Sequence, residues 1–209
     1  MAYRVICISS EDGSGGLGAA QLVARELGFR VIDEEIVTRA AVEAGVEEEV
    51  VADVEQRKSI LVRLIESVGS AGMGTGYVMA PPEGAGYGQP VSDELRGLIK
   101  SVIEETAAEG EVVIVSHAAS LALGLRDDVL RVLLTASTRT REQRFGAVLG
   151  LDEKEAARAL KRSDAGRADY IKRFYGIAAE LPTHYDLVIN TDKLTPEDAA
   201  RVIVSAAGG

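Results

Sequence analysis

The arrangement that most constrains the fold is an apolar stretch that runs directly into a glycine-dense turn. Residues 5–8 are apolar and mostly β-branched, which predicts a buried strand over about 4–9, and a helix over about 16–27 follows the turn. Glycine lets a backbone curl around a ligand, and a helix N-terminus carries about half a positive charge. This order therefore predicts a phosphate-binding site made of backbone amides. Its residues would be Gly13, Ser14, Gly15, Gly16, Leu17 and Gly18.

The turn lacks the side chains that usually accompany such a site. A complete P-loop ends in Gly-Lys-Ser/Thr, in which the lysine reaches the terminal phosphates and the hydroxyl holds Mg²⁺. Here the corresponding stretch is Gly15-Gly16-Leu17-Gly18, with neither lysine nor hydroxyl. The sequence predicts an anion site whose positive charge comes from elsewhere in the chain. The alternative is a tight strand-to-helix turn that binds nothing.

Composition limits the classes of function. With 209 residues, the chain is expected to form one domain over 1–209. A net charge of −10 argues against a nucleic-acid polymer or an anionic membrane as partner. The charge is uneven, because residues 139–173 carry ten Lys and Arg against six Asp and Glu. A basic segment on an acidic body suits a small, highly charged anion, although a solvated basic helix face would have the same composition.

Cysteine usage and hydropathy add further limits. One cysteine, Cys7, and two histidines argue against a disulfide framework or a zinc site. No apolar stretch reaches 18 residues, which argues against a membrane span and favours a cytoplasmic protein. Any metal would be Mg²⁺ brought with a nucleotide and held largely by phosphates and water.

Apolar runs and helical periodicity alternate along the rest of the chain. Strands are predicted over about 29–32, 112–115, 129–134 and 186–189. Helices are predicted over about 33–44, 46–54, 57–68, 92–109, 139–149, 152–162 and 164–179, and from Pro196 onward. This alternation predicts an α/β fold, with a doubly wound five-stranded parallel sheet and helices on both faces.

Two segments are expected to lie outside that sheet. A glycine-rich insertion over about 69–91 is longer than ordinary connections. It contains apolar and aromatic residues that could pack against a second subunit, so residues 58–90 are predicted to mediate a homo-oligomer. Residues 139–180 are predicted to form a helical region beside the site.

Three motifs agree with this layout. Residues 9–16 are Ser-Ser-Glu-Asp-Gly-Ser-Gly-Gly, residues 164–170 are Asp-Ala-Gly-Arg-Ala-Asp-Tyr, and residues 185–191 are Tyr-Asp-Leu-Val-Ile-Asn-Thr. They resemble the Ser-Arg-Glu-x-Gly-Ser-Gly-Gly, Asp-x-x-Arg-x-x-Tyr and Tyr-Asp-Leu-x-Ile-Asn-Thr motifs of the cytidylate-kinase-like family, a branch of the P-loop nucleoside monophosphate kinases. The chain departs from the family at charged positions. Leu17 stands in place of an arginine, and Ser116-His117 in place of Gly-Arg.

The resemblance implies a P-loop kinase-like fold with a helical lid, an insertion for the nucleoside monophosphate, and roles for individual residues. Three residues would face the acceptor nucleotide: Asp33, Arg39 and His117. Two arginines would join the glycine turn in binding phosphate: Arg141 and Arg144. Three lid residues would act in catalysis: Arg162, Asp164 and Arg167. The alternatives are a helix N-cap for Asp33, a structural role for His117, and surface ion pairs among the lid residues.

Three functions remain open at this point. The first is transfer of the terminal phosphoryl group of ATP to a nucleoside monophosphate such as CMP, with Mg²⁺. The second is binding of a nucleotide or phosphorylated metabolite without efficient transfer, in a regulatory role. The third is an assembly module whose glycine turn stays empty. The absent lysine and Leu17 favour the second function, whereas the retained Gly-Ser-Gly-Gly and lid motif favour the first.

Overall fold

The computed structural model describes residues 3–32, 100, 103–115 and 119–208. Within these ranges the predicted α/β fold is confirmed. The helices predicted between 33 and 68, the insertion over 69–91 and the oligomer surface over 58–90 lie outside the described residues. The same holds for Asp33, Arg39 and His117.

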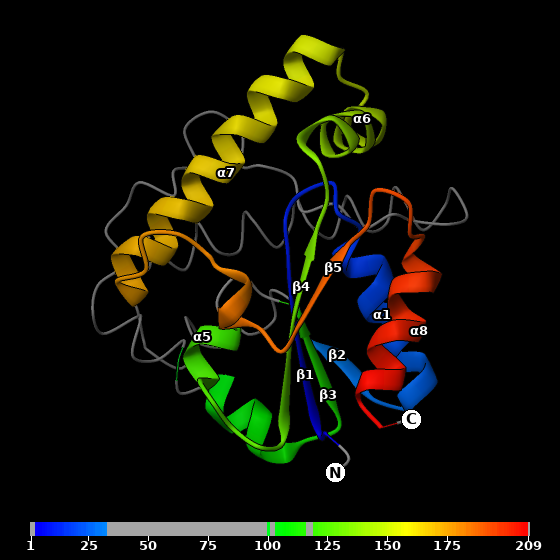
Figure 1. Ribbon diagram of the computed structural model, residues 1–209, viewed down its shortest axis with the longest axis vertical. Coiled ribbons are helices and arrows are strands. Elements are labelled where there is room, and N and C mark those ends of the chain that lie inside the picture. Colours follow the sequence, from blue (N-terminus) through cyan, green and yellow to red (C-terminus); the bar gives the residue numbers. More distant parts are fainter. Residues whose placement is uncertain (1–2, 33–99, 101–102, 116–118, 209) are drawn as a thin grey trace, which may run out of the picture.

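A five-stranded parallel sheet forms the centre of the molecule (Figure 1). Its strands are β1 Val5–Ser10, β2 Arg30–Ile32, β3 Val112–Val115, β4 Val129–Thr135 and β5 Leu187–Asn190. They are ordered β2-β3-β1-β4-β5, and each neighbouring pair is parallel. The three central strands, β1, β3 and β4, are buried almost throughout and are near-continuous apolar runs, which is why the sequence pattern located them to within one or two residues.

The order of the strands places a crevice beside the end of β1. The chain leaves β1 toward β2 on one side of the sheet, whereas it leaves β4 toward β5 on the other. Such a reversal opens a crevice outside the carboxyl ends of the two strands, where α/β proteins bind ligands. The glycine turn follows β1 directly, and Glu11 N–H donates to Leu134 O of β4 at 3.1 Å. The turn is therefore fixed at the reversal point.

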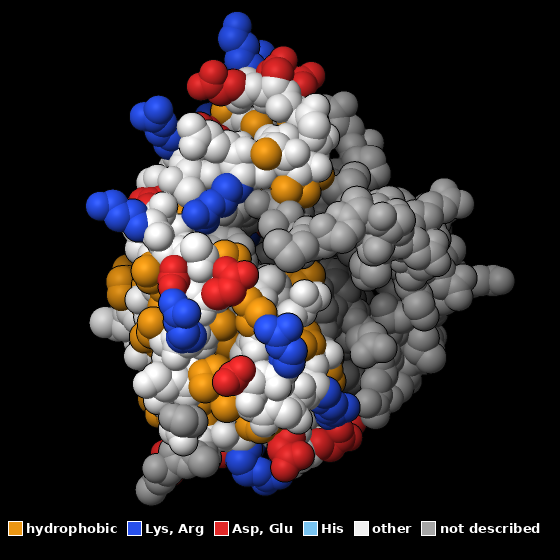
Figure 2. All heavy atoms as spheres, turned by 90° about the vertical axis from the view of Figure 1, so that its right-hand side faces the viewer, with side chains coloured by type: hydrophobic (Ala, Val, Ile, Leu, Met, Phe, Trp, Pro, Cys, Tyr) orange, Lys and Arg blue, Asp and Glu red, His pale blue; other side chains and the backbone are white. Residues whose placement is uncertain are grey.

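Helices cover both faces of the sheet, as predicted. Helices α1, Gly16–Leu27, and α8, Pro196–Ala206, pack together on one face (Figure 1). The helical residues 103–109 and the short helix α5, Ala119–Leu123, contribute to a second cluster with the opposite side chains of β1 and β3. The outer surface seen in Figure 2 mixes hydrophobic side chains with charges of both signs.

Two helices, α6 and α7, extend beyond the sheet and form the predicted helical region (Figure 1). Helix α6 is Thr138–Leu149 and α7 is Glu153–Tyr175. They pack through Phe145 of α6 and Ala159 and Leu160 of α7. Gly150, with φ 65°, ends α6, and Asp152 forms a capping box with Glu155 at the start of α7.

The prediction of two helices over 152–162 and 164–179 is wrong, because α7 is continuous through this stretch. The stretch contains Ser163, Asp164 and Gly166, residues that disfavour a helix interior, since Ser and Asp often hydrogen-bond their own backbone and Gly is flexible. Here the Ser163 and Asp164 side chains instead bind Asp12 and Arg141, which lie elsewhere in the chain. Tertiary contacts therefore override the local signal.

Among the described helices, none is both long enough and apolar enough to cross a bilayer.

Candidate functional site

The backbone of the glycine turn has the geometry of an anion cradle. Gly13 and Gly15 have left-handed φ values of 80° and 86°, which favour glycine. The first-turn amides of an α-helix have no acceptor within the helix. In α1 the N-cap is Gly15, which has no side chain, so the cap residue supplies no acceptor either. Ser14 closes the turn, because its N–H and Oγ both donate to Glu11 O, at 2.9 and 2.6 Å.

Helix α6 lies directly against this turn. A Cβ added to Gly13 would lie 2.6 Å from Arg141 O, so only glycine allows this approach. Arg141 Nε donates to Asp12 O at 2.7 Å, and Arg144 Nη1 donates to Gly13 O at 3.4 Å. Arg144 also reaches the turn after β5, where its Nη2 donates to Thr191 O at 2.7 Å. The structure thus brings both predicted phosphate-binding arginines to the glycine turn.

The turn also carries two carboxylates of its own. Glu11 accepts a hydrogen bond from Thr135 Oγ1 and lies 3.6 Å from Arg141 Nη1. Asp12 accepts from Ser163 Oγ of α7. Burial raises the pKa of Asp12, and the hydrogen bond from Ser163 and the charge of Arg141 oppose that rise. These two carboxylates offset part of the positive charge that the arginines bring to the cradle.

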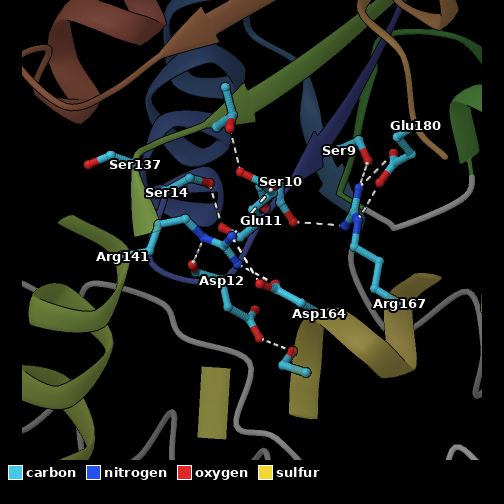
Figure 3. Close-up of polar contacts among 12 residues, drawn as sticks. Ser9, Ser10, Glu11, Asp12, Ser14, Ser137, Arg141, Asp164, Arg167 and Glu180 are labelled. Atoms are coloured by element: carbon cyan, nitrogen blue, oxygen red, sulfur yellow. Dashed lines mark hydrogen bonds and ion pairs between the residues drawn. The ribbon is translucent and has the colours of Figure 1, made fainter. Parts of the chain in front are cut away.

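Asp164 and Arg167 of the predicted lid contact residues outside α7, rather than forming surface ion pairs with one another (Figure 3). Asp164 accepts from Arg141, with Nη1 at 3.2 Å from Oδ2. Arg167 is buried and donates to Glu180, Ser9 and Ser10. Arg162 is exposed on α7. The described contacts of Asp164 and Arg167 are thus inward contacts to the site rather than surface pairs along α7.

A cavity of about 310 Å³ lies between the turn and α7. Glu11, Asp164, Arg167 and Glu180 line its polar side, and Ile171 lies on its apolar side. Glu180 and Thr191 were missed by sequence reasoning. Thr191 could have been found, since it ends the Tyr-Asp-Leu-x-Ile-Asn-Thr motif. Glu180 belongs to none of the motifs, and its pairing with Arg167 follows from the path of the chain after α7.

The donor set at the turn suits phosphate better than a bare metal ion. In the part of the chain that the structure describes, no three His, Cys, Asp or Glu residues group closely enough to hold a metal. Backbone amides at a helix N-terminus and nearby guanidinium groups are the usual partners of phosphate oxygens.

This fold and turn define an α/β protein with a P-loop kinase-like architecture. The sequence profile of the cytidylate kinase-like family matches residues 5–193. The chain belongs to this family and is a kinase-like protein, as the motifs in its sequence predicted. No curated protein sequence matches the chain.

Solved structures agree on the fold. An uncharacterized protein from Eubacterium ventriosum ATCC 27560 has a TM-score of 0.67 at 17% identity, with 98% of each chain covered. TT1252 from Thermus thermophilus has a TM-score of 0.52 at 18% identity, covering 100% of this chain and 98% of its own. A shikimate kinase from Bacteroides thetaiotaomicron covers 98% of both chains at 14% identity. Its TM-score is 0.48.

Proposed function

We propose that this protein binds a nucleoside triphosphate at the glycine turn and transfers its terminal phosphoryl group to a nucleoside monophosphate such as CMP. The observation that carries the proposal is the position of residues 13–18 at the sheet's reversal point. Arg144 is bonded there to Gly13 O, and Arg141 is bonded to Asp12 O directly before this stretch. Phosphoryl transfer needs mostly positioning and stabilisation of negative charge. Bound Mg²⁺ would neutralise charge on the phosphates.

Different residues would bind the phosphates, assist the transfer and contact the acceptor. The amides of Gly13 to Gly18 would bind phosphate oxygens, and Arg144 would add a guanidinium beside them. Arg162 and Asp164 would act from α7, and the acceptor would contact Asp33, Arg39 and His117. Arg141 is buried and paired with Asp164, so it would hold Asp164 and add positive charge beside the phosphates.

A second function is favoured by the charge of the turn. Gly16 and Leu17 supply neither cation nor hydroxyl, and Glu11 and Asp12 bring negative charge. A site of this kind would bind a nucleotide or phosphorylated metabolite without efficient transfer. Loss of one preorganised transition-state donor lowers a rate by about 10²- to 10³-fold. We therefore expect turnover well below the typical value of about 10 per second.

Calorimetric titration with ADP and CMP tests binding, and an assay of ADP release tests transfer. Arg144→Ala should weaken ADP binding by about tenfold, the scale of one charge-assisted hydrogen bond. The matched control is Arg201→Ala, because Arg201 lies on α8 and pairs only locally with Asp198 in the described contacts. Equal ADP affinity in both variants would show that Arg144 does not contribute to the phosphate site. Binding without ADP release would select the second function.

A further inference from the structure

Arg167 occupies a closed set of protein contacts. It is 8% exposed. Its Nε donates to Glu180 Oε2 at 2.6 Å, and its Nη2 donates to Glu180 Oε1 at 2.9 Å and to Ser9 Oγ at 2.7 Å. Its Nη1 donates to Ser10 O at 2.9 Å. A guanidinium has five N–H donors, and these four bonds use most of them.

Glu180 is itself held in place by a second buried side chain. Tyr185, which is 7% exposed and lies just before β5, donates its hydroxyl to Glu180 Oε1. Burial, reinforced by this hydrogen bond, raises the pKa of Tyr185 to about 12, so the hydroxyl keeps its proton at neutral pH. An unpaired buried arginine is strongly destabilising, so Glu180 is the partner that allows Arg167 to be buried.

The other end of this network is the start of the glycine turn. Ser9 and Ser10 are the last residues of β1, and Ser9 is 1% exposed. One helical turn earlier on α7, Ser163 donates to Asp12 and Asp164 accepts from Arg141. Helix α7 therefore fixes the chain from Ser9 to Asp12, immediately before the phosphate-binding amides (Figure 3).

We propose that Arg167 is a positioning residue that fixes the glycine turn through Ser9 and Ser10, with Glu180 and Tyr185 holding its guanidinium, and that it does not bind phosphate itself. A phosphate bound to the Nε and Nη2 fork of Arg167 would have to displace the bidentate Glu180 carboxylate. The inference rests on the proposed function, since the turn it positions is the proposed anion site.

The variant Glu180→Gln separates the two roles by the sign of its effect. If Arg167 bound phosphate and Glu180 merely competed for it, removing the carboxylate would strengthen binding of pyrophosphate. A positioning role predicts the opposite, a loss of about tenfold, because the turn loses its fixed geometry. Removing a negative charge near an anion site cannot by itself cause such a loss. Arg167→Lys should weaken pyrophosphate binding to a similar extent, since a point charge cannot reproduce the bidentate fork.

Arg131 and Asp186 provide a matched control. They form a bidentate pair at 3.0 and 2.6 Å between β4 and the residue before β5, and none of their described contacts involves the glycine turn. Asp186→Asn should leave pyrophosphate affinity unchanged. Tyr185→Phe is a milder change and should lower pyrophosphate affinity by about threefold. It replaces Glu180→Gln in the test if that variant does not fold. Tighter pyrophosphate binding in Glu180→Gln would overturn the positioning role.

Backbone amide NMR signals of the ligand-free protein keep this test independent of the proposed function. The signals of Gly13, Gly15 and Gly16 should shift in Glu180→Gln, or in Tyr185→Phe, and not in Asp186→Asn. If the wild type binds no pyrophosphate, the proposed function fails while these shifts still decide the positioning role. Unchanged glycine signals would refute that role even if pyrophosphate binds normally.

Discussion

The side chain of Ser10 occupies the space that any side chain at position 16 would need. A Cβ added to Gly16 would lie 2.3 Å from Ser10 Cβ and 2.2 Å from Ser10 Oγ. Gly16 lies in α1 and has no left-handed φ, so this contact rather than backbone strain requires glycine there. In a P-loop, position 16 holds the lysine and position 10 holds a glycine. The two departures from that motif are therefore coupled by packing.

Restoring the lysine should succeed only when the serine is removed. Gly16→Lys alone should lower the melting temperature, because overpacking costs about 1–3 kcal/mol. The double variant Ser10→Gly with Gly16→Lys should fold and bind ADP about tenfold more tightly than wild type, through a new charge-assisted hydrogen bond. Melting curves and calorimetric titration of the single and double variants measure both effects. A single variant as stable as wild type would contradict the packing argument.

Because α6 lies so close to the turn, replacing Gly13 should cost more stability than replacing Gly28, a glycine with a similar backbone conformation. Gly13 has φ 80° and would meet Arg141 O at 2.6 Å, whereas Gly28 has φ 72° and no heavy atom within 4 Å of an added Cβ. Gly28→Ala should cost about 1–2 kcal/mol for the left-handed backbone alone. Gly13→Ala should cost about 2 kcal/mol more, because α6 must move. Urea unfolding measures the free energy of unfolding of both variants. Equal losses of stability would show that α6 moves away from the turn at little cost.

Replacing Asp12 should change stability in a pH-dependent way. The pKa of Asp12 is raised by burial, so its contribution to stability is present below the unfolded-state value of 3.8 and is lost as pH rises through the folded-state pKa. Asp12→Asn removes this loss while keeping an oxygen to accept from Ser163. The variant should therefore gain free energy of unfolding relative to wild type between pH 3 and 7. Urea unfolding across this range checks the direction, and a constant difference would contradict it.

The same substitution should strengthen anion binding at the turn. Asp12 lies beside the proposed phosphate cradle, and its carboxylate opposes a bound anion. We expect Asp12→Asn to bind pyrophosphate about threefold more tightly at neutral pH, with the gain shrinking at higher salt. Calorimetric titration at two salt concentrations provides the measurement. Weaker binding would mean that the Asp12 carboxylate is needed to hold the turn.

Cys7 should make the protein sensitive to alkali. Burial raises the pKa of the Cys7 thiol from 9.0 to about 12, so the unfolded chain loses this proton at lower pH than the folded chain. Stability from this group is present below pH 9 and is lost toward pH 12, by about 1.4 kcal/mol for each pH unit. Cys7→Ala should be less stable than wild type at pH 8, with a gap that narrows above pH 9. Urea unfolding at several pH values tests this, and a constant gap would contradict it.

Local sequence signals determined the elements of this protein. Gly28 ends α1 with φ 72°, Asp152 and Glu155 form the cap of α7, and Thr195 with Pro196 begins α8. These features depend on residues within about four positions of one another, so short patterns suffice to predict them. The glycine turn was found in the same way, since its strand, turn and helix are contiguous in the sequence. The phosphate-binding role assigned to the turn stays a prediction.

Only the tertiary structure decided which charges meet at the site. Arg167 binds Ser10 across a separation of 157 residues, and Arg141 binds Asp12 across 129. The continuity of α7 also depends on such contacts, because Ser163 and Asp164 find partners outside their own helix. Long side chains have many energetically similar partners in an unfolded chain, and the fold selects among them by burial and geometry. The sequence therefore determined which elements carry the charged residues. The packing of α6 and α7 against β1 decided which partner each of them binds.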